Sequence, residues 1–303
     1  MDRTRIGLLS ALVLINILFV FGWIRAVRRH RLTGRPTWSD AVIGFVTDLL
    51  DTLGIGSFAP TTALFKLRGR PADELIPGTL NVGHNVTAFL EGFLMIGSIA
   101  VDPTLLACMI GTATIGAWLG AGVVSRLPRR KIQLFMGVAL LVAAVFFLMR
   151  NLDEVFHLSV FPPNGTALAL HGWKFVFAVG INFVLGALMC IGIGNYAPTV
   201  IILSLLGMNT LAAFPIMMGS DGLVQPVASL RFFRSGRFAH GPSLGLGLGG
   251  VFGVLVAFYI LKGLSVTAMR WLVIVIVAYA ALSMLRSARL QRSAEVEAGG
   301  AAT

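Results

Sequence analysis

A nine-residue phrase that occurs twice constrains this chain more than any other feature. Residues Leu53 to Thr61 read LGIGSFAPT, and residues Ile191 to Thr199 read IGIGNYAPT. Both copies lie inside long apolar stretches, where Gly-x-Gly followed by Pro interrupts a helix. Two helix breaks at equivalent points of two related halves indicate the binding site of a transporter. The alternative is a pair of purely structural kinks.

The relationship between the two halves extends beyond the phrase itself. The copies are 138 positions apart, and the same offset holds without a gap from Phe45 and Phe183 to Pro77 and Pro215. The chain therefore carries an internal repeat.

The composition is that of a polytopic membrane protein. Of 303 residues, 56% are hydrophobic and only 12% are charged. The net charge of +11 comes from short basic clusters between apolar segments, as the positive-inside rule produces, and excludes a nucleic-acid-binding face. The two cysteines, Cys108 and Cys190, give neither a disulfide framework nor a metal-ligand spacing. We expect no metal and no cofactor.

Seven apolar stretches have about the 20 residues that a bilayer crossing needs. The first is followed by a basic cluster and no cleavage site, so we expect a retained helix. The seven predicted spans are Ile6–Ile24, Asn81–Ala100, Pro103–Val124, Ile132–Met149, Ala212–Leu230, Pro242–Leu261 and Thr267–Leu285. The repeated phrases divide two other stretches into four shorter pieces, Asp40–Leu53, Pro60–Leu67, Lys174–Ile191 and Pro198–Leu206.

The basic clusters decide how the divided stretches lie. If each is a re-entrant hairpin, every basic cluster falls on the cytoplasmic side and the loop at 151–172 is external. If each crossed completely, the cluster Arg126–Lys131 would fall on the side opposite Arg25–Arg35. The hairpin arrangement satisfies the rule at every loop and makes the two halves inverted relative to each other.

The sequence thus predicts an all-α polytopic membrane protein built from two inverted-topology repeats. Each repeat is a re-entrant broken-helix hairpin plus three transmembrane helices, and one extra helix precedes them. The expected divisions are an N-terminal helix and basic loop (1–39), a first repeat (40–150), an external loop (151–172), a second repeat (173–285) and a cytoplasmic tail (286–303). We expect a bacterial inner membrane, with the N-terminus outside and the C-terminus in the cytoplasm.

The helix breaks suit an oxyanion. Unpaired backbone N–H groups and the dipole at the start of each half-helix offer positive character without a buried Arg or Lys. Glycines allow the backbone to approach the ligand, and hydroxyl and amide side chains add donors. The predicted binding residues at the breaks are Gly54, Gly56, Ser57, Thr61, Gly192, Gly194, Asn195 and Thr199. Alternatively, Ser57 and Asn195 only cap their helices.

Ionisable residues inside apolar helices are costly and mark functional sites. We predict that Asp48, Asp51, His84 and Glu91 couple transport to a proton or to sodium. The residues at the 138-position offset from the three acids are not acidic, as expected if one half carries the coupling chemistry. The alternatives are a satisfied interhelical hydrogen bond for His84, and ion pairs with Lys66 or a loop arginine for the two aspartates. Polar residues of the following spans complete the predicted substrate site: Asn81, His84, Asn85, Ser220 and Asp221.

The doubled Gly-Ile-Gly-x-[Phe/Tyr]-Ala-Pro-Thr, each copy followed by an apolar half-helix and a span with a polar start, resembles the sulfite exporter TauE/SafE family of membrane permeases. The resemblance covers Asp40 to Leu285 and implies transport of sulfite, organosulfonates or related sulfur anions. Ser57 and Asn195 stand where that family often has a third glycine.

We therefore expect a permease for a small anion, with the lipid bilayer and that anion as its partners. The rival functions are an anion channel and a membrane-embedded enzyme using Asp48, Asp51, His84 and Glu91. The chain has no nucleophile elbow, no His-Glu-x-x-His and no metal-ligand spacing, which argues against the enzyme. The sequence leaves the oligomeric state open.

Overall fold

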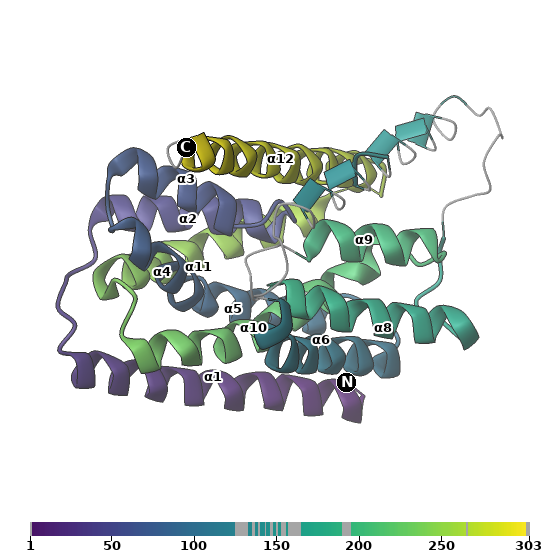
Figure 1. Cartoon of the computed structure of the whole chain (residues 1–303). Coiled ribbons are helices and arrows are strands. Elements are labelled where there is room, and N and C mark those ends of the chain that lie inside the picture. The colour runs from purple at the N-terminus through teal and green to yellow at the C-terminus, as the bar shows by residue number, and fades with distance from the viewer. Residues whose placement is uncertain are drawn as a thin grey trace.

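The computed structural model describes residues 2–124, 165–189, 195–264 and 266–300, together with short pieces between 133 and 156. Its regular elements in these ranges are helices (Figure 1). They are α1 (Arg3–His30), α2 (Trp38–Thr52), α3 (Phe58–Arg68), α4 (Ile76–Gly83), α5 (Asn85–Ser98), α6 (Pro103–Val124), α8 (Gly172–Met189), α9 (Tyr196–Leu205), α10 (Ala213–Ser235), α11 (His240–Gly263) and α12 (Val266–Gly300), with 3-10 turns at Asp73–Leu75 and Thr210–Ala212.

The first predicted helix break is present where the repeated phrase places it, and the described residues on either side of the second are helical. The first divided stretch forms α2 and α3, and the second forms α8 and α9. Gly54 and Gly56, between α2 and α3, have φ of 98° and 93°, a backbone conformation that favours glycine. Gly192 and Gly194 lie outside the described residues, as do Cys190 and the cluster Arg126–Lys131.

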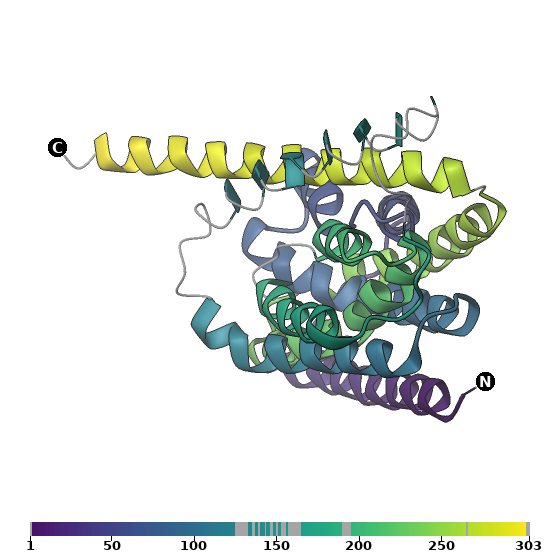
Figure 2. The same cartoon turned by 90° about the vertical axis from the view of Figure 1, so that its right-hand side faces the viewer.

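The predicted span Asn81–Ala100 is wrong as a single helix. The chain forms α4 and α5 instead, with a turn at His84. Gly83, a residue of low helix preference, precedes this turn, and hydrogen bonds hold the His84 ring from two other helices. The other predicted spans that lie wholly in described residues are helical. α12 also continues past the predicted end at Leu285 to Gly300, and Figure 2 shows its C-terminal end projecting beyond the bundle.

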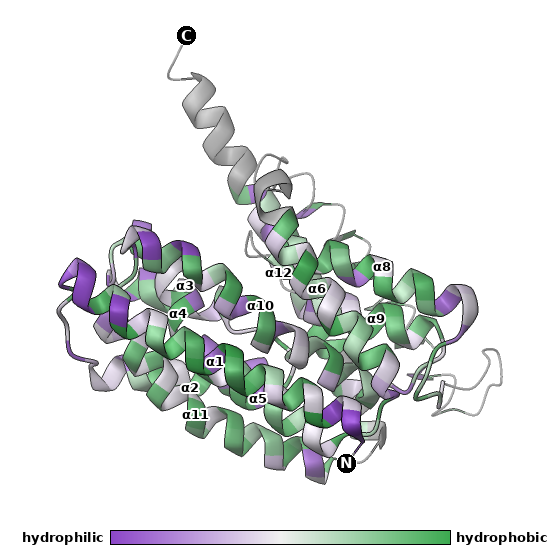
Figure 3. Ribbon diagram, turned by 90° about the horizontal axis from the view of Figure 1, so that it is seen from below, coloured by the Kyte–Doolittle hydropathy of each residue, from purple (hydrophilic) through white to green (hydrophobic). Residues whose placement is uncertain are grey.

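The outer surface of the bundle is apolar, as a lipid-facing surface requires. α1, α8 and α11 are long and apolar enough to cross a bilayer. Large apolar side chains such as Phe21, Trp118 and Phe252 are exposed on the outside of α1, α6 and α11. Figure 3 shows these helices predominantly hydrophobic, with hydrophilic residues gathered toward helix ends and loops. The chain is therefore an all-α membrane protein.

Two helix pairs pack with their backbones in close contact. A Cβ on Gly249 of α11 would lie 1.8 Å from the carbonyl oxygen of Ala41 in α2, and one on Gly116 of α6 would lie 2.0 Å from that of Phe183 in α8. Both contacts need glycine, which allows helices to approach closely. Under the 138-position offset α2 corresponds to α8, and α6 corresponds to α11. The first helix of each half is thus packed against a later helix of the other half.

α10 forms the centre of the protein. Every residue from Ala213 to Pro226 is buried, although the stretch includes Asp221 and Gln225. α1, α5 and α6 pack around this helix, and α9 contacts it from the side of the second helix break. The helix therefore carries polar side chains to the interior, beside the two breaks.

Candidate functional site

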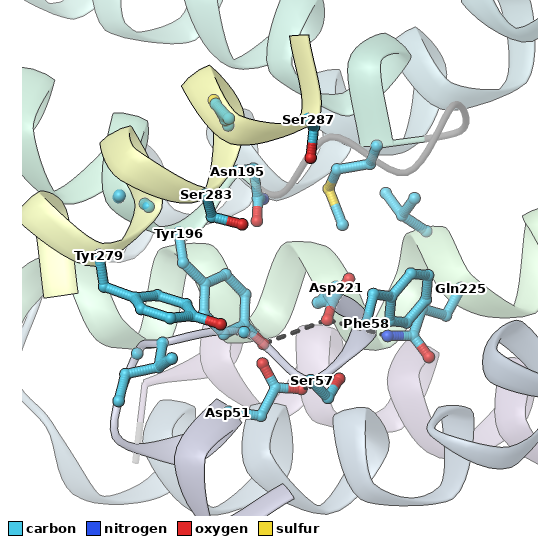
Figure 4. Close-up of a pocket in the computed structure, with 18 of the residues that line it drawn as sticks. Asp51, Ser57, Phe58, Asn195, Tyr196, Asp221, Gln225, Tyr279, Ser283 and Ser287 are labelled. Atoms are coloured by element: carbon cyan, nitrogen blue, oxygen red, sulfur yellow. Dashed lines mark hydrogen bonds between the residues drawn. The ribbon is translucent and has the colours of Figure 1, made fainter. Parts of the chain in front are cut away.

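The α2–α3 break and the start of α9 line the same cavity, which has a volume of about 170 Å³ (Figure 4). Drug-sized ligands occupy pockets of roughly 300–1,000 Å³, so this cavity fits a compact solute. Its walls come from the α2–α3 break, the start of α9, the middle of α10 and one face of α12. The polar side chains that line it are Asp51, Ser57, Asn81, Gln133, Asn195, Tyr196, Asp221, Gln225, Tyr279, Ser283 and Ser287.

The polar groups at the start of α3 are occupied by partners within the protein. The Ser57 hydroxyl donates to Asp51 Oδ2 over 2.7 Å. The Thr61 hydroxyl lies 2.8 Å from the Ser57 carbonyl oxygen and 3.0 Å from Nε2 of His84. Ser57 stands at the N-cap of α3 without making a side-chain capping bond, so the capping alternative does not hold for this residue.

The start of α9 corresponds to the start of α3 in the repeat, but its polar side chains lack hydrogen-bond partners among the described residues. Asn195 is the N-cap residue, is 1% exposed, and makes no capping bond. Among the described residues, neither its amide nitrogen nor its amide oxygen has a hydrogen-bond partner, and the buried Thr199 hydroxyl has none either. Asn195 lines the cavity and Thr199 does not. Burying an amide without partners is costly, so these atoms are available to a ligand.

His84 lies behind the cavity wall and joins three helical segments. Its Nδ1 lies 2.7 Å from Asp48 Oδ1, which also accepts a 2.8 Å hydrogen bond from the Thr87 hydroxyl. Both ring nitrogens are therefore paired, as the interhelical hydrogen-bond alternative expected. The described residues do not form the alternative ion pairs of Asp48 and Asp51 with Lys66 or a loop arginine: Lys66 is exposed, and Arg68 pairs with Asp40 at the start of α2.

Tyr196 connects carboxylates from the two halves of the chain. Its hydroxyl lies 3.1 Å from Asp221 Oδ2 and 3.3 Å from Glu91 Oε2. A phenol has a single hydrogen, so it donates to only one of these oxygens at a time. The other oxygen of Glu91 accepts from Thr52 over 2.5 Å, and Asp221 Oδ2 also accepts from Gln225 over 3.0 Å. The three acidic and phenolic groups form one buried network.

Five of the predicted substrate residues do not line the cavity: Thr61, His84, Asn85, Thr199 and Ser220. Asn85 donates to Asn16 of α1 over 2.8 Å, on the far side of its helix. Ser220 donates to the carbonyl oxygen of Ile216 within α10. The structure brings Gly54, Gly56, Ser57, Asn81, Asn195 and Asp221 together at the cavity, and it places Asp48, Thr61, His84, Glu91 and Thr199 among buried residues outside its lining.

Several residues of the site were not predicted. Tyr196 is the most important, and it occupies the one place in the repeated phrase where the second copy adds a hydroxyl to the phenylalanine of the first, Phe58. That difference was a usable signal. Tyr279, Ser283 and Ser287 of α12 recur every four residues and line the cavity from one face of that helix. This spacing alone does not distinguish them from other residues of a transmembrane helix.

The lining is acidic where it is charged. Asp51 and Asp221 contribute carboxylates, and no lysine, arginine or histidine from the described residues lines the cavity. The same part of the chain holds no group of three His, Cys, Asp or Glu residues arranged for a metal ion. Compared with family models, with curated proteins and with solved structures, the chain shows no match.

Proposed function

We propose that this protein is a secondary transporter that moves a small sulfur-containing anion, such as sulfite or an organosulfonate, across the membrane. One observation carries the proposal. The α2–α3 break and the start of α9, which carry the two copies of the repeated sequence, line a single compact cavity inside an apolar helical bundle. Binding sites built from discontinuous helices of two repeats are typical of secondary transporters. The choice of a sulfur-containing anion as the substrate rests on the resemblance to the sulfite exporter TauE/SafE family.

The packing of the helices supports two inverted repeats. α2 pairs with α11 and α8 pairs with α6, and the 138-position offset converts one pair into the other. Such an exchange is what a two-fold axis relating the halves would produce. We infer that α2–α3 and α8–α9 are the two re-entrant hairpins, one entering from the cytoplasm and the other from outside.

The start of a half-helix is suited to an anion. Its first N–H groups have no acceptor within the helix, and the helix dipole adds partial positive charge. Pro60 and Pro198 stand in the first turns of α3 and α9, where a missing N–H group costs nothing. Small anions can be bound by such groups without lysine or arginine.

We further infer that transport is coupled to a proton or to sodium through Asp48, Asp51, His84 and Glu91. All four side chains are fully or almost fully buried. Buried acids in a membrane protein are retained at a cost when they carry ions. The hydrogen-bonded chain from Asp48 through His84 to Thr61 supports this role for the first half.

Flux through proteoliposomes tests the function. The purified protein is reconstituted, and uptake of sulfite, ethanesulfonate and sulfate is measured with pH and sodium gradients imposed separately. We expect concentrative uptake of at least one sulfur anion under one gradient. Gly56→Leu, which places a side chain at φ of 93° in the cavity wall, should abolish uptake, whereas Gly97→Leu on the exposed face of α5 should not. Rapid downhill flux that no gradient can concentrate would indicate a channel instead.

A further inference from the structure

The starts of α3 and α9 are equivalent in sequence, but different side chains lie beside them in the cavity. Asp51 precedes the first break, and the residue 138 positions later is Met189. Ser57 and Asn195 are equivalent N-cap residues, yet the Ser57 side chain is hydrogen-bonded and the Asn195 side chain has no partner in the part of the chain that the structure describes. The cavity is therefore asymmetric, although the phrase that forms it is repeated.

The positive end of α3 already holds an anion that belongs to the protein. The carboxylate of Asp51 accepts the Ser57 hydroxyl at the N-cap position, where the helix dipole favours negative charge. Thr61 is bound to the Ser57 carbonyl and to His84. A second anion at this end would have to displace Asp51 or be repelled by it.

The positive end of α9 holds no such internal anion. Met189 replaces the aspartate, and Asn195 presents an unpartnered amide into the cavity while being only 1% exposed. The unpartnered hydroxyl of Thr199 lies one helical turn further along. A buried amide without partners points to a ligand that is not part of the chain. An acidic group of the substrate is best accommodated here.

The opposite wall of the cavity carries carboxylates, so it suits a positively charged group of a ligand. Asp51 and Asp221, one from each half, both line it, and Figure 4 shows them on either side of the Tyr196 hydroxyl. The amide oxygen of Gln225, which is 3% exposed, has no hydrogen-bond partner beside them. Carboxylate and amide oxygens together bind a positive group, and no described basic residue neutralises them in the cavity lining.

We propose that the cavity binds opposite charges at its two walls: an acidic group at the start of α9, on Asn195, and a positive group between Asp51 and Asp221. The inference rests on the proposed transport function and narrows its substrate class. The positive group has one of two sources. It is either the ammonium of a zwitterion, such as an aminosulfonate, or a separate sodium ion that binds together with a simple anion.

Binding to the purified full-length protein in detergent separates the two sources. The probes are ethanesulfonate and 2-aminoethanesulfonate, which differ by an amine, each titrated calorimetrically in sodium chloride and in choline chloride. The zwitterion arm predicts that 2-aminoethanesulfonate binds about tenfold or more tightly than ethanesulfonate in choline chloride. The sodium arm predicts that ethanesulfonate binds only when sodium is present. Either result supports two walls of opposite charge.

Variants locate the two walls. Asn195→Ala should weaken binding of both sulfonates by about ten- to hundredfold, the range for losing a hydrogen bond to a charged group. Ser204→Ala, at the other end of α9, is its matched control and should bind normally. Asp221→Asn should remove the preference for the amine or for sodium. Ser57→Ala should weaken binding less than Asn195→Ala does, because Ser57 serves Asp51.

Three outcomes overturn the inference. Equal binding of the two sulfonates without sodium would show that the acidic wall receives no positive group. A larger loss for Ser57→Ala than for Asn195→Ala would move the anion to α3. In both cases the proposed transport function would stand, provided that liposome uptake is observed. If neither sulfonate binds under any condition and no sulfur anion is taken up, the inference and the proposed function both fail.

Discussion

The imidazole of His84 lies 2.7 Å from the carboxylate of Asp48, a residue 36 positions earlier in the chain. Both side chains are completely buried, and the second ring nitrogen reaches Thr61 at 3.0 Å. A ring that is held from two sides fixes α2, α3 and the α4–α5 turn relative to one another. Under the proposed function, the same hydrogen bonds give a proton a path between Asp48 and the start of α3.

We predict that His84→Gln keeps substrate binding and loses accumulation driven by a pH gradient. Glutamine can retain hydrogen bonds but cannot accept and release a proton near neutral pH. The measurement is anion uptake in proteoliposomes at several imposed pH gradients. His171→Gln, at an exposed position before α8, is the matched control. Undiminished pH-driven accumulation in His84→Gln would remove the histidine from the coupling path.

Replacing Asp48 should destabilise the folded protein in addition to any effect on transport. Asp48→Ala leaves Nδ1 of His84 without its partner, and breaking a buried pair costs about 3–5 kcal/mol. We expect a clear fall in the unfolding temperature of the detergent-solubilised protein. Thr114→Ala, which removes a hydroxyl bonded only within α6, should change it little. A normal unfolding temperature in Asp48→Ala would show that the pair is not a structural element.

Tyr196→Phe removes the hydroxyl that links Glu91 and Asp221. The ring should still fit, because the equivalent residue of the first half is Phe58. The buried carboxyl groups lose the one hydrogen that this phenol donates, and an unsatisfied buried polar group costs about 1–3 kcal/mol. We expect a lower unfolding temperature and slower transport. Tyr259→Phe, on the exposed face of α11, should leave both quantities unchanged. The network has no role if the two variants behave alike.

Gly249→Ala should destabilise the contact between α2 and α11. The added Cβ would lie 1.8 Å from the carbonyl oxygen of Ala41, so the helices must separate. Overpacking of this kind costs about 1–3 kcal/mol. Gly180→Ala, on an exposed part of α8 with open space around it, should be neutral or stabilising by about 0.5–1 kcal/mol. The measurement is the unfolding temperature of both variants. A fall for Gly249→Ala alone would show that the helix contact is responsible, whereas a fall for both would mean that alanine is tolerated poorly at either glycine.

Single cysteines test the topology. In a background with Cys108 and Cys190 replaced by serine, we expect cysteines at Leu67 and Arg129 to react with an impermeant thiol reagent from the same, cytoplasmic side. Re-entrant hairpins require this because each returns to the side from which it enters. Labelling from opposite sides would mean that the divided stretches cross the membrane, and the inverted arrangement would be wrong.

The sequence predicted the helix breaks well because their cause is local. Glycine at positive φ and proline in a first turn act on their own segment, so LGIGSFAPT determines the end of α2 and the start of α3. The bounds of α6 followed from the same kind of signal, an apolar run that begins at Pro103. The classification as an all-helical membrane protein followed from composition.

Side-chain partners were harder to predict because they depend on distant helices. Asn85 lies one residue from His84, yet it turns toward Asn16 on α1 while His84 turns toward α2 and α3. Helical spacing gives the face of a residue, but the identity of the helix opposite that face depends on the whole packing. The turn at His84 has the same origin: its tertiary hydrogen bonds are invisible in the local sequence.

The helices that pack most closely belong to different copies of the repeat, so the units that pack together are not the units that are repeated in the sequence. α2 is held against α11 and α8 against α6 at backbone distance, so each tightly packed unit contains helices from both copies of the repeat. A movement of one copy as a separate rigid body would have to break these backbone contacts. If the cavity opens alternately to the two sides of the membrane, the rocking parts must be these mixed pairs, and the hinge must run through the repeats instead of between them.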